Sequence, residues 1–381
     1  MFCLSTWIQR GALGVSDSTF GFPVSNTLLF KSQLGRLGMA TIVIADDGIP
    51  FHGVTPEEGP LGGAESAVVS LANSFAIRGH EVTVFTATEK KVFHKGVSWL
   101  PLSNELPRFA SLYIANRSDQ LIPLVPDATT RVFWIHNPAQ YLLKFRYLQK
   151  LFRWKPVIIF SGTFHANTCP NWVPEGGRKV IPYGITDTFL NIRRRGITPP
   201  VAVFASNPLR SLDWLLDVWV NKIYPLSPLA ELHVYSGPET YGTFGITHAE
   251  AMGQILKKAN SCENYGVKVL APVKKSQLAK VYANARVMLY RGDPGETFCL
   301  AIAESQSAGV PAVVQNIGCV AERIIDGETG FVTSDDIDFA KKASALLNDD
   351  ALWLQQCQNA LERQGSWSWD EAAKAFESLM V

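Results

Sequence analysis

Several features that define other protein classes are scarce or missing in this sequence. Its six cysteines contain no C-x-x-C pair, and none stands near two histidines at the spacing of a zinc site. This argues against a metal centre and a disulfide framework, so a reducing cytosol is the compartment we expect. No apolar run reaches the length of a membrane span. The formal net charge is +1, so no overall field attracts nucleic acid, and the G-x-G-x-x-G dinucleotide fingerprint is absent.

The composition fits a globular protein with sizeable cores, since 47% of the residues are hydrophobic and 18% are charged. A length of 381 residues favours two domains. Residues 1–38 lack the basic start and the clean apolar block of a signal peptide. Met39 directly precedes ATIVIADDG, a pattern typical of a buried strand. We therefore expect the folded domain to begin at Met39, after a poorly ordered extension or a mis-chosen start.

From that point onward, short runs of β-branched residues alternate with helical patterns, which indicates parallel β-α-β units. In the first half we expect a helix at 64–79 and strands at 41–47, 81–87, 131–137, 156–162 and 179–184. The pattern then restarts, with helices at 212–223, 301–309 and 338–350 and strands at 201–206, 230–237, 267–273, 285–292 and 311–316. The predicted fold is α/β, with two Rossmann-like doubly wound domains. A deep cleft between them is the expected ligand site.

The domain boundaries follow from the same pattern. We expect residues 39–186 to form the first Rossmann-like domain and residues 201–365 to form the second. The segment 187–200 is charged and then bears Gly and Pro, as a linker does. A capping box that begins at Ser368 starts a last helix within 366–381. We expect this helix to cross back to the first domain.

Two clusters of charge have a simpler structural interpretation than a functional one. The stretch YLLKFRYLQKLFRWK (141–155) is basic and aromatic, and its cations are spread around the expected helix. It can touch anionic lipid, but we favour a packed helix whose lysines and arginines extend to solvent. Asp335, Asp336 and Asp338 resemble a metal-binding pattern, but they precede a peripheral helix. We interpret them as a cluster at a helix N-terminus.

Two features of the first half are suited to a ligand. Gly62 and Gly63 lie between a strand and a helix, where glycine lets the backbone approach a ligand and the helix N-terminus favours a phosphate. A tight strand-to-helix turn explains the two glycines equally well. His136 ends the strand expected at 131–137 and would point into the cleft. The alternative is a hydrogen-bonded histidine at the edge of a sheet.

The second half offers three more candidates. Arg210 follows the first strand of that half and can clamp a diphosphate, although a solvated arginine at a helix start is the simpler interpretation. In GETFCLAIAE, Glu296 lies in a loop and Glu304 in the following helix, and carboxylates accept hydrogen bonds from sugar hydroxyls. A partly exposed acidic pair is the alternative. Against it, Glu304 lies amid small and apolar residues, where a carboxylate needs partners.

Together, these motifs resemble those of the GT-B glycosyltransferases of family 4 (glycosyl transferases group 1), which are retaining enzymes with nucleotide-sugar donors. The resemblance spans roughly residues 39–381. Its most specific feature is the pair of glutamates with seven residues between them, followed by A-G-V-P and then D-G-x-T-G-F. The matching pieces are GGAE…LANSFAIRGHEVTVFT (62–86), FWIHN (133–137), VIPYGI (180–185), LAPV…VPAVV (270–314), IDGETGFV (325–332) and the final SWSW helix.

The resemblance implies a role for each candidate side chain. Glu296 would contact hydroxyls of the transferred sugar, and Glu304 would hold the ribose hydroxyls of the nucleotide. Arg210 would neutralise the diphosphate leaving group, and His136 would lie near the sugar and the acceptor. Tyr183 stands where the family usually has an asparagine. Backbone groups that would contact the donor come from both domains: Gly62, Gly63, Thr297, Phe298, Cys299, Leu300 and Val273.

The chain departs from the family at one place. A second basic residue usually precedes the one that matches Arg210, but residues 204–207 contain no cation. One interpretation is that Ser206 and Asn207 hydrogen-bond the phosphate. Another is that a cation from elsewhere helps, with three candidates in the sequence: Lys274, Lys275 and Arg291. Weaker catalysis is the third.

The function implied is that of a retaining glycosyltransferase of the hexosyltransferase class. It would move a sugar from a nucleotide-sugar, with UDP- and GDP-sugars favoured, to an unidentified hydroxyl of a carbohydrate, a lipid-linked molecule or a small molecule. No cofactor, metal or nucleic acid is expected, and the location is cytoplasmic with at most peripheral contact at the inner face of the membrane. The alternatives are a nucleotide-sugar epimerase, for which further acid/base carboxylates cannot be placed, and a non-catalytic sugar-nucleotide-binding protein.

Overall fold

The computed structural model describes residues 38–192, 194 and 196–380. Residues 39–381 form one compact unit, whereas the expected extension lies outside the described residues apart from Gly38. The unit contains two separate sheets, and each builds one parallel-sheet domain. This confirms the predicted α/β fold class.

The sheet of the first domain has eight strands in the order β3-β4-β2-β1-β5-β6-β7-β8, and only β3 runs antiparallel to its neighbour. Its strands are β1 (Thr41–Asp46), β2 (Glu81–Thr86), β3 (Val92–His94), β4 (Val97–Pro101), β5 (Leu112–Asn116), β6 (Thr130–Trp134), β7 (Val157–Phe160) and β8 (Gly177–Val180). Its helices are α1 (Thr55–Glu58), α2 (Gly63–Ile77), the 3-10 helix η1 (Ala139–Leu143), α3 (Phe145–Trp154) and α4 (Thr163–Asn167).

The sheet of the second domain has six parallel strands in the order β11-β10-β9-β12-β13-β14. They are β9 (Val201–Phe204), β10 (Glu231–Tyr235), β11 (Val267–Leu270), β12 (Val287–Leu289), β13 (Ala312–Gln315) and β14 (Gly330–Thr333). The α-helices that follow β8 in the chain are α5 (Asp187–Leu190), α6 (Leu212–Val218), α7 (Gly242–Thr247), α8 (Ala249–Ser261), α9 (Lys275–Ala283), α10 (Leu300–Ser307), α11 (Asp336–Asn348), α12 (Asp350–Gln364) and α13 (Trp369–Glu377). Short η2 (Trp219–Ile223), η3 (Tyr224–Leu226), η4 (Pro238–Tyr241), η5 (Glu263–Tyr265) and η6 (Val320–Arg323) complete the set.

Both sheets are doubly wound, and the strand order reverses once in each. In the first sheet the chain leaves β1 for β2 on one side and later returns to β5 on the other side. In the second sheet the same reversal separates β9 from β12. Ligands of open α/β sheets bind outside the carboxyl ends of the strands at such a switch point. The fold therefore directs attention to the loops that follow β1, β5, β9 and β12.

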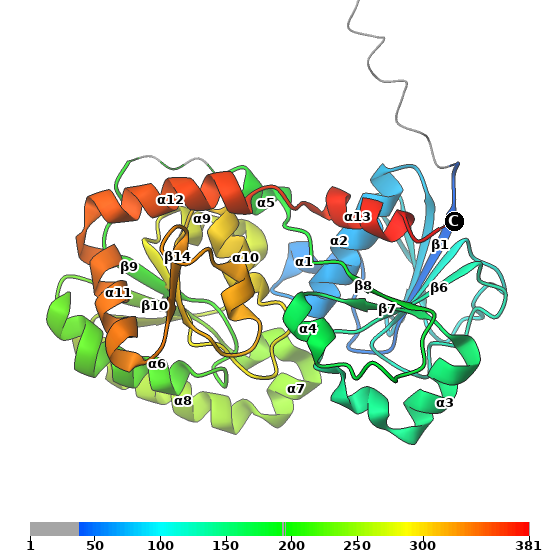
Figure 1. The fold of residues 1–381 in the computed structure, drawn as a ribbon, viewed down its shortest axis with the longest axis horizontal. Coiled ribbons are helices and arrows are strands. Elements are labelled where there is room, and N and C mark those ends of the chain that lie inside the picture. The colour runs from blue at the N-terminus through cyan, green and yellow to red at the C-terminus, as the bar shows by residue number, and fades with distance from the viewer. Residues whose placement is uncertain (1–37, 193, 195, 381) are drawn as a thin grey trace, which may run out of the picture. The chain divides into compact units, whose positions relative to one another are not determined.

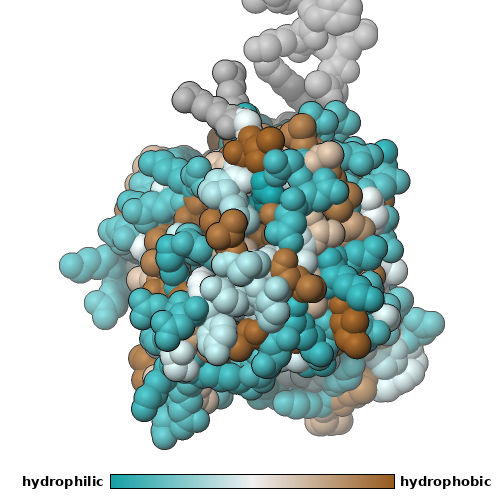
Figure 2. Space-filling view, turned by 90° about the vertical axis from the view of Figure 1, so that its left-hand side faces the viewer, coloured by the Kyte–Doolittle hydropathy of each residue, from teal (hydrophilic) through white to brown (hydrophobic). Residues whose placement is uncertain are grey.

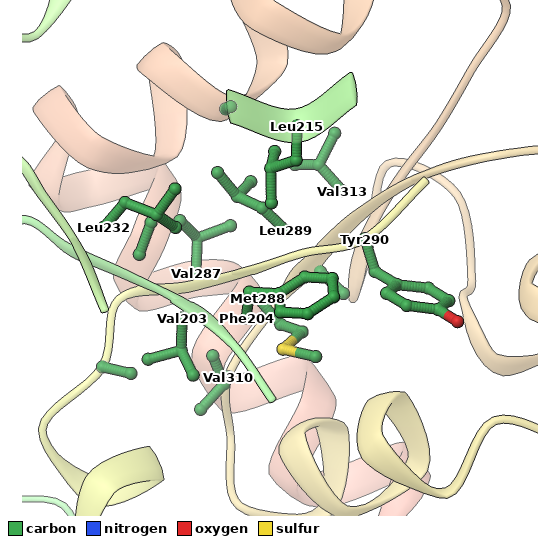
Figure 3. Close-up of a cluster of buried hydrophobic side chains, with 14 of the residues drawn as sticks. Val203, Phe204, Leu215, Leu232, Val287, Met288, Leu289, Tyr290, Val310 and Val313 are labelled. Atoms are coloured by element: carbon green, nitrogen blue, oxygen red, sulfur yellow. The ribbon is translucent and has the colours of Figure 1, made fainter. Parts of the chain in front are cut away.

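The core of the second domain fixes the strands that carry these loops. Aliphatic side chains of β9, β10, β12 and β13 pack together with Leu215 of α6 (Figure 3). Tyr290 follows β12 and its ring is buried, but its hydroxyl points out of the cluster (Figure 3). This hydroxyl is therefore available to a side chain beside the core.

The structure corrects several expected boundaries. The strand expected at 131–137 ends at Trp134, so His136 lies in the loop beyond it. The helix expected at 212–223 is α6 up to Val218, followed by a short π-helix. The prediction missed β3, β4, β5 and β14. Each is only three to five residues long, and β14 begins with a glycine, so none of them gives a strong strand signal.

The segment expected as a linker packs on the second domain. It contains α5, whose Phe189 is buried with its ring 5.8 Å from that of Tyr282. Arg194 donates hydrogen bonds to the carbonyls of Tyr282, Ala285 and Ala308 at 2.7 to 3.0 Å. This segment thus forms part of the second domain's packing in addition to connecting the two domains.

The last helix lies on the first domain, beside α2 (Figure 1). The Ser368 hydroxyl caps α13 by accepting a hydrogen bond from the backbone of Glu371. Arg78 at the end of α2 pairs with Asp370 and Glu377 of α13 at 2.8 and 2.5 Å. The C-terminus therefore ties the second domain to the first through both ionic and apolar contacts.

Candidate active site

A cavity of about 700 Å³ lies between the two domains. Its walls come from the loops after β1, β5, β6, β9 and β12 and from the starts of α2 and α10. All thirteen site residues named from the sequence line it: Gly62, Gly63, His136, Ser206, Asn207, Arg210, Val273, Glu296, Thr297, Phe298, Cys299, Leu300 and Glu304. The structure thus brings together every candidate, at the place where both sheets reverse their strand order.

Glu296 is held by two side chains of its own domain. The Tyr290 hydroxyl donates a hydrogen bond to Glu296 Oε2 at 2.6 Å, and Arg210 forms an ion pair with Oε1. Burial opposes the charge of Arg210, but the nearby Glu296 carboxylate outweighs it, so the pKa of Arg210 lies above its ordinary value. Arg210 is therefore positively charged at any physiological pH.

Glu304 lies within α10, is almost completely buried, and pairs with Lys275 at the start of α9. This explains how a carboxylate is tolerated among small apolar residues, because its charge is compensated. Lys275 also lines the cavity. Of the two other cations considered from the sequence, Lys274 contacts the carbonyl of Glu57 at 3.3 Å and Arg291 contacts Gln315 at 3.0 Å, and neither is part of the cavity wall.

Two helix N-termini line the cavity and lie close to each other. Helix α10 starts after Cys299 and helix α2 starts after Gly62, and no described side chain caps either of them. A Cβ atom on Gly63 would lie 3.2 Å from Leu300 Cδ1, so the two helix starts are in close contact. A Cβ on Gly62 would collide with the Glu65 carboxylate. Glycine at 62 therefore lets the Glu65 carboxylate approach the backbone, and glycine at 63 lets the Leu300 side chain approach it.

His136 is fixed at both ring nitrogens. The Tyr183 hydroxyl donates to Nδ1, and Nε2 lies 2.5 Å from Asn116 Oδ1. Asn116 donates through Nδ2 to Asp46, so its Oδ1 accepts and His136 carries its proton on Nε2. Burial, together with repulsion by Arg117, holds the pKa of His136 well below its ordinary value. The imidazole is therefore neutral, and its orientation is fixed. Tyr183, which stands where the family usually has an asparagine, is one of the two residues that fix it.

Arg117 is a site residue that the sequence analysis missed. It lies directly after β5, in a left-handed backbone conformation with φ of 59°. Its guanidinium lines the cavity and bridges Asp46 and Glu65 at 2.7 and 2.9 Å. Burial opposes its charge, but these two carboxylates outweigh burial and raise its pKa. Its position directly after a strand at the switch point could have identified Arg117 as a candidate, but only if β5 had been predicted.

The loop before α10 also joins the two domains. Thr297 donates through its hydroxyl to the backbone carbonyl of His136 at 2.6 Å, and its own carbonyl accepts from the Ser161 hydroxyl at 3.0 Å. The ring of Phe298 lies 4.7 Å from that of Tyr183. The loop therefore couples the position of the second-domain wall to that of the first.

Three other predicted site residues, Asn207, Ser206 and Cys299, have local structural roles. Asn207 Oδ1 accepts a hydrogen bond from the backbone of Leu209 at 2.9 Å, which stabilises the turn before α6. The Ser206 carbonyl accepts from the Ser236 hydroxyl at 2.5 Å. Burial raises the pKa of the Cys299 thiol well above its usual range, so this cysteine is an inert part of the wall.

The described residues hold no group of three or more His, Cys, Asp and Glu side chains placed to bind a metal ion. The aspartates near residue 336 instead start a helix, since Asp335 accepts from the backbone of Ile337 and Asp338. Among the described helices, none is long and apolar enough to cross a membrane.

Comparison with known proteins finds similarity to one family within the second domain. The family model described as glycosyl transferases group 1 matches residues 199–349. A D-inositol 3-phosphate glycosyltransferase of Corynebacterium diphtheriae is 32% identical over 115 residues, which cover 30% of this chain and 27% of that protein. One of Nocardioides sp. is 26% identical over 185 residues, covering 46% of this chain and 40% of the relative. The chain thus spans less than half the length of the curated relatives it matches.

Solved structures are similar over most of the chain. Sucrose-phosphate synthase from Thermosynechococcus elongatus has a TM-score of 0.69 at 15% identity, covering 89% of this chain and 98% of that one. Anabaena HepE in complex with UDP and glucose has a TM-score of 0.64 at 14% identity, with the same coverage. At such low identity these similarities establish the fold, including the arrangement of two domains around a cleft.

Proposed function

Because this chain has the GT-B fold and its residues 199–349 match the glycosyl transferases group 1, we propose that it is a retaining glycosyltransferase that transfers a hexosyl group from a nucleotide-sugar to an acceptor hydroxyl. The observation that carries the proposal is the pair of uncapped helix N-termini, of α2 and α10, facing one cavity that also contains Arg210 and Lys275. Backbone N–H groups and positive helix ends favour an anion, and two flanking cations favour one with more than one charge. A diphosphate meets these requirements.

The two glutamates give this diphosphate an orientation. Glu304 lies inside α10, and the wall beyond it includes the backbone at Val273. We assign the ribose to Glu304, the base to the region of Val273, and the transferred sugar to Glu296 on the other side of the diphosphate. UDP-sugars are the first donors to test, because HepE, which shares this fold, was solved with UDP and glucose.

Arg210 and Lys275 supply the two positive charges. In the structure each is paired with a glutamate, Glu296 and Glu304 respectively. When the donor binds, the Arg210 guanidinium turns from Glu296 to the diphosphate, and Glu296 is released to the sugar hydroxyls. Lys275 takes the place of the basic residue that the segment 204–207 lacks. The absence of a cation from 204–207 is the feature that would favour a non-catalytic binder, so Lys275 favours the enzyme.

The chemistry needs little more than charge stabilisation. The bond between the anomeric carbon and the phosphate oxygen breaks, and the acceptor oxygen bonds to the same face of the sugar. The departing phosphate oxygen takes the proton of the acceptor hydroxyl. Preorganised positive groups that face the developing diphosphate charge lower the barrier most. His136 is neutral and held at both nitrogens, so it shapes the sugar and acceptor region and does not act as a base.

The experiment is a turnover assay with UDP-, GDP- and ADP-sugars, alone and with a panel of hydroxyl acceptors. Hydrolysis or transfer is followed by nucleotide release, and the anomeric configuration of the product by NMR. Glu296→Gln keeps the shape of the side chain and removes its charge. Glu328→Gln is the matched control, because Glu328 pairs with Arg363 away from the cavity wall.

We expect Glu296→Gln to lower turnover by about a hundredfold, as loss of a transition-state contact does, and Glu328→Gln to leave it unchanged. The product should keep the anomeric configuration of the donor. An inverted product would overturn the retaining mechanism. Tight binding of a nucleotide-sugar without any turnover would instead indicate a binding protein.

A further inference from the structure

Helix α3 lies at the edge of the first domain (Figure 1), and it carries two exposed aromatic side chains. Phe145 and Phe152 are 79% and 70% exposed. They are seven residues apart, so they lie on the same side of the helix, two turns apart. Two phenylalanines so exposed, side by side on one helix, need an explanation beyond packing.

The opposite side of α3 already fills the core. Tyr147 and Leu151 are buried there, and the Tyr147 ring lies 6.3 Å from that of Phe133 in β6. The helix is therefore anchored without any help from Phe145 and Phe152. The expected packed helix is thus observed on its inner face, with Arg146 and Arg153 exposed as expected.

The charged residues of the segment that carries the two exposed rings have one sign. Residues 139–155 contain five lysines and arginines and no carboxylate. Lys150 is held by the buried Asp119 at 2.7 Å, and Arg146 reaches the same carboxylate at 3.4 Å but remains exposed. Arg153 is also exposed, one residue from Phe152, as Arg146 is one residue from Phe145. Each exposed ring is thus flanked by an arginine.

The exposed apolar residues described in the second domain lack this combination of neighbouring aromatic rings and arginines. The outer face of the second domain is mostly hydrophilic, and its hydrophobic patches are small and separate (Figure 2). Leu229 and Ile337 are 88% and 58% exposed in that domain, but Ile337 follows acidic residues at the start of α11. A helix with aromatic rings on its exposed face and cations beside them is suited to the boundary between lipid headgroups and acyl chains. Anionic headgroups attract the cations.

We propose that the outer face of α3, formed by Phe145, Arg146, Phe152 and Arg153, docks on an anionic lipid surface. The two rings enter the headgroup region, and the two arginines contact the phosphates. Only residues 137–144 separate His136 from α3, so docking places the first-domain wall of the cavity near the membrane surface. An acceptor presented at that surface would have a short path to the site. The docking itself is independent of the proposed function.

The test is sedimentation of the full chain with vesicles of phosphatidylcholine, with and without phosphatidylglycerol, at two salt concentrations. The variants are Phe145→Ser/Phe152→Ser and Arg146→Gln/Arg153→Gln. Leu229→Ser/Ile337→Ser is the matched control, because it removes two exposed apolar side chains without neighbouring arginines. Circular dichroism confirms that each variant is folded, which we expect because the replaced side chains are exposed.

We expect binding to the anionic vesicles alone, weakened by salt. The arginine variant should lower the partition coefficient by about thirtyfold and the phenylalanine variant by at least about tenfold. The control should bind as the wild type does. The proposal is overturned if the wild type does not bind anionic vesicles, or if both α3 variants bind as tightly as the wild type. Self-association that depends on Phe145 and Phe152, without vesicle binding, would overturn it in favour of a second copy. A protein that docks but lacks turnover would refute the proposed function and leave this surface intact.

Discussion

Replacement of Arg210 by methionine tests whether its charge matters more for turnover than for stability. Methionine keeps much of the apolar stem and removes the guanidinium that pairs with Glu296. The Arg210 side chain is about one-third exposed, so solvent weakens the pair, and Glu296 keeps the Tyr290 hydroxyl. We therefore expect the free energy of unfolding to fall by only about 1–2 kcal/mol.

The effect on turnover should be larger than the effect on stability. A preorganised charged donor that faces a leaving diphosphate lowers the activation barrier by about 3–4 kcal/mol. Its removal therefore corresponds to about a 10²–10³-fold loss in kcat. Single-turnover kinetics with a UDP-sugar measures this loss, and urea unfolding measures stability. The control is Arg363→Met, whose partner Glu328 lies away from the cavity wall.

The double variant Arg210→Met/Glu296→Gln sharpens the test. It removes the unpaired carboxylate, so we expect most of the lost stability to return while turnover stays low. If Arg210→Met alone reacts within about threefold of the wild type, while its unfolding free energy falls as expected, the diphosphate is held by other groups and the reasoning is refuted.

Three further predictions test other parts of the molecule. Lys275→Met should lower kcat about 10–100-fold, and Lys275→Arg should retain most of the wild-type kcat. If Lys275→Met is as active as Lys275→Arg, Lys275 only compensates the charge of Glu304. Gly184→Ala places a Cβ against the backbone of Trp369, so it should lower the free energy of unfolding in urea by about 2–4 kcal/mol. As its control, Gly253→Ala adds a methyl group in open space on α8 and should raise the free energy of unfolding by about 0.5–1 kcal/mol. Burial lowers the pKa of His165 to about 4, whereas its value in the unfolded chain is about 6.5. Between these two pH values the unfolded chain binds more protons than the folded protein, so the free energy of unfolding rises with pH in that range. Acidification from about pH 7 to about pH 5 should therefore cost about 2 kcal/mol through this residue, and an unchanged pH dependence in His165→Gln would contradict this.

The doubly wound fold was predictable because its strands are continuous β-branched runs between helical patterns. β1 and β9 are such runs, and the predicted positions differ from the observed ones by one or two residues. β5 has the sequence LYIAN, and its assignment depends on its pairing with β1 and β6. That pairing is a tertiary property, so a local pattern does not reveal it.

The candidate site was predictable to the extent that its residues lie in local motifs. The motif GETFCLAIAE carries both glutamates, and the glycines at 62 and 63 precede α2 directly. The partners of these residues are far away in the sequence. Lys275 reaches Glu304 from another helix, and Arg117 reaches Asp46 from another strand. Long-range ion pairs depend on how elements pack, which explains why Arg117 was missed and why Lys275 was one of three candidates.

The central claim is that the cavity between the two domains binds the diphosphate of a nucleotide-sugar. The most direct measurement is isothermal titration calorimetry of UDP, GDP and ADP with the wild type, Arg210→Met and Lys275→Met. The account predicts one site for at least one of these nucleotides, with affinity weakened about tenfold or more in each variant. If none of the three nucleotides binds the wild type, or if both variants bind as tightly as the wild type, the claim is contradicted.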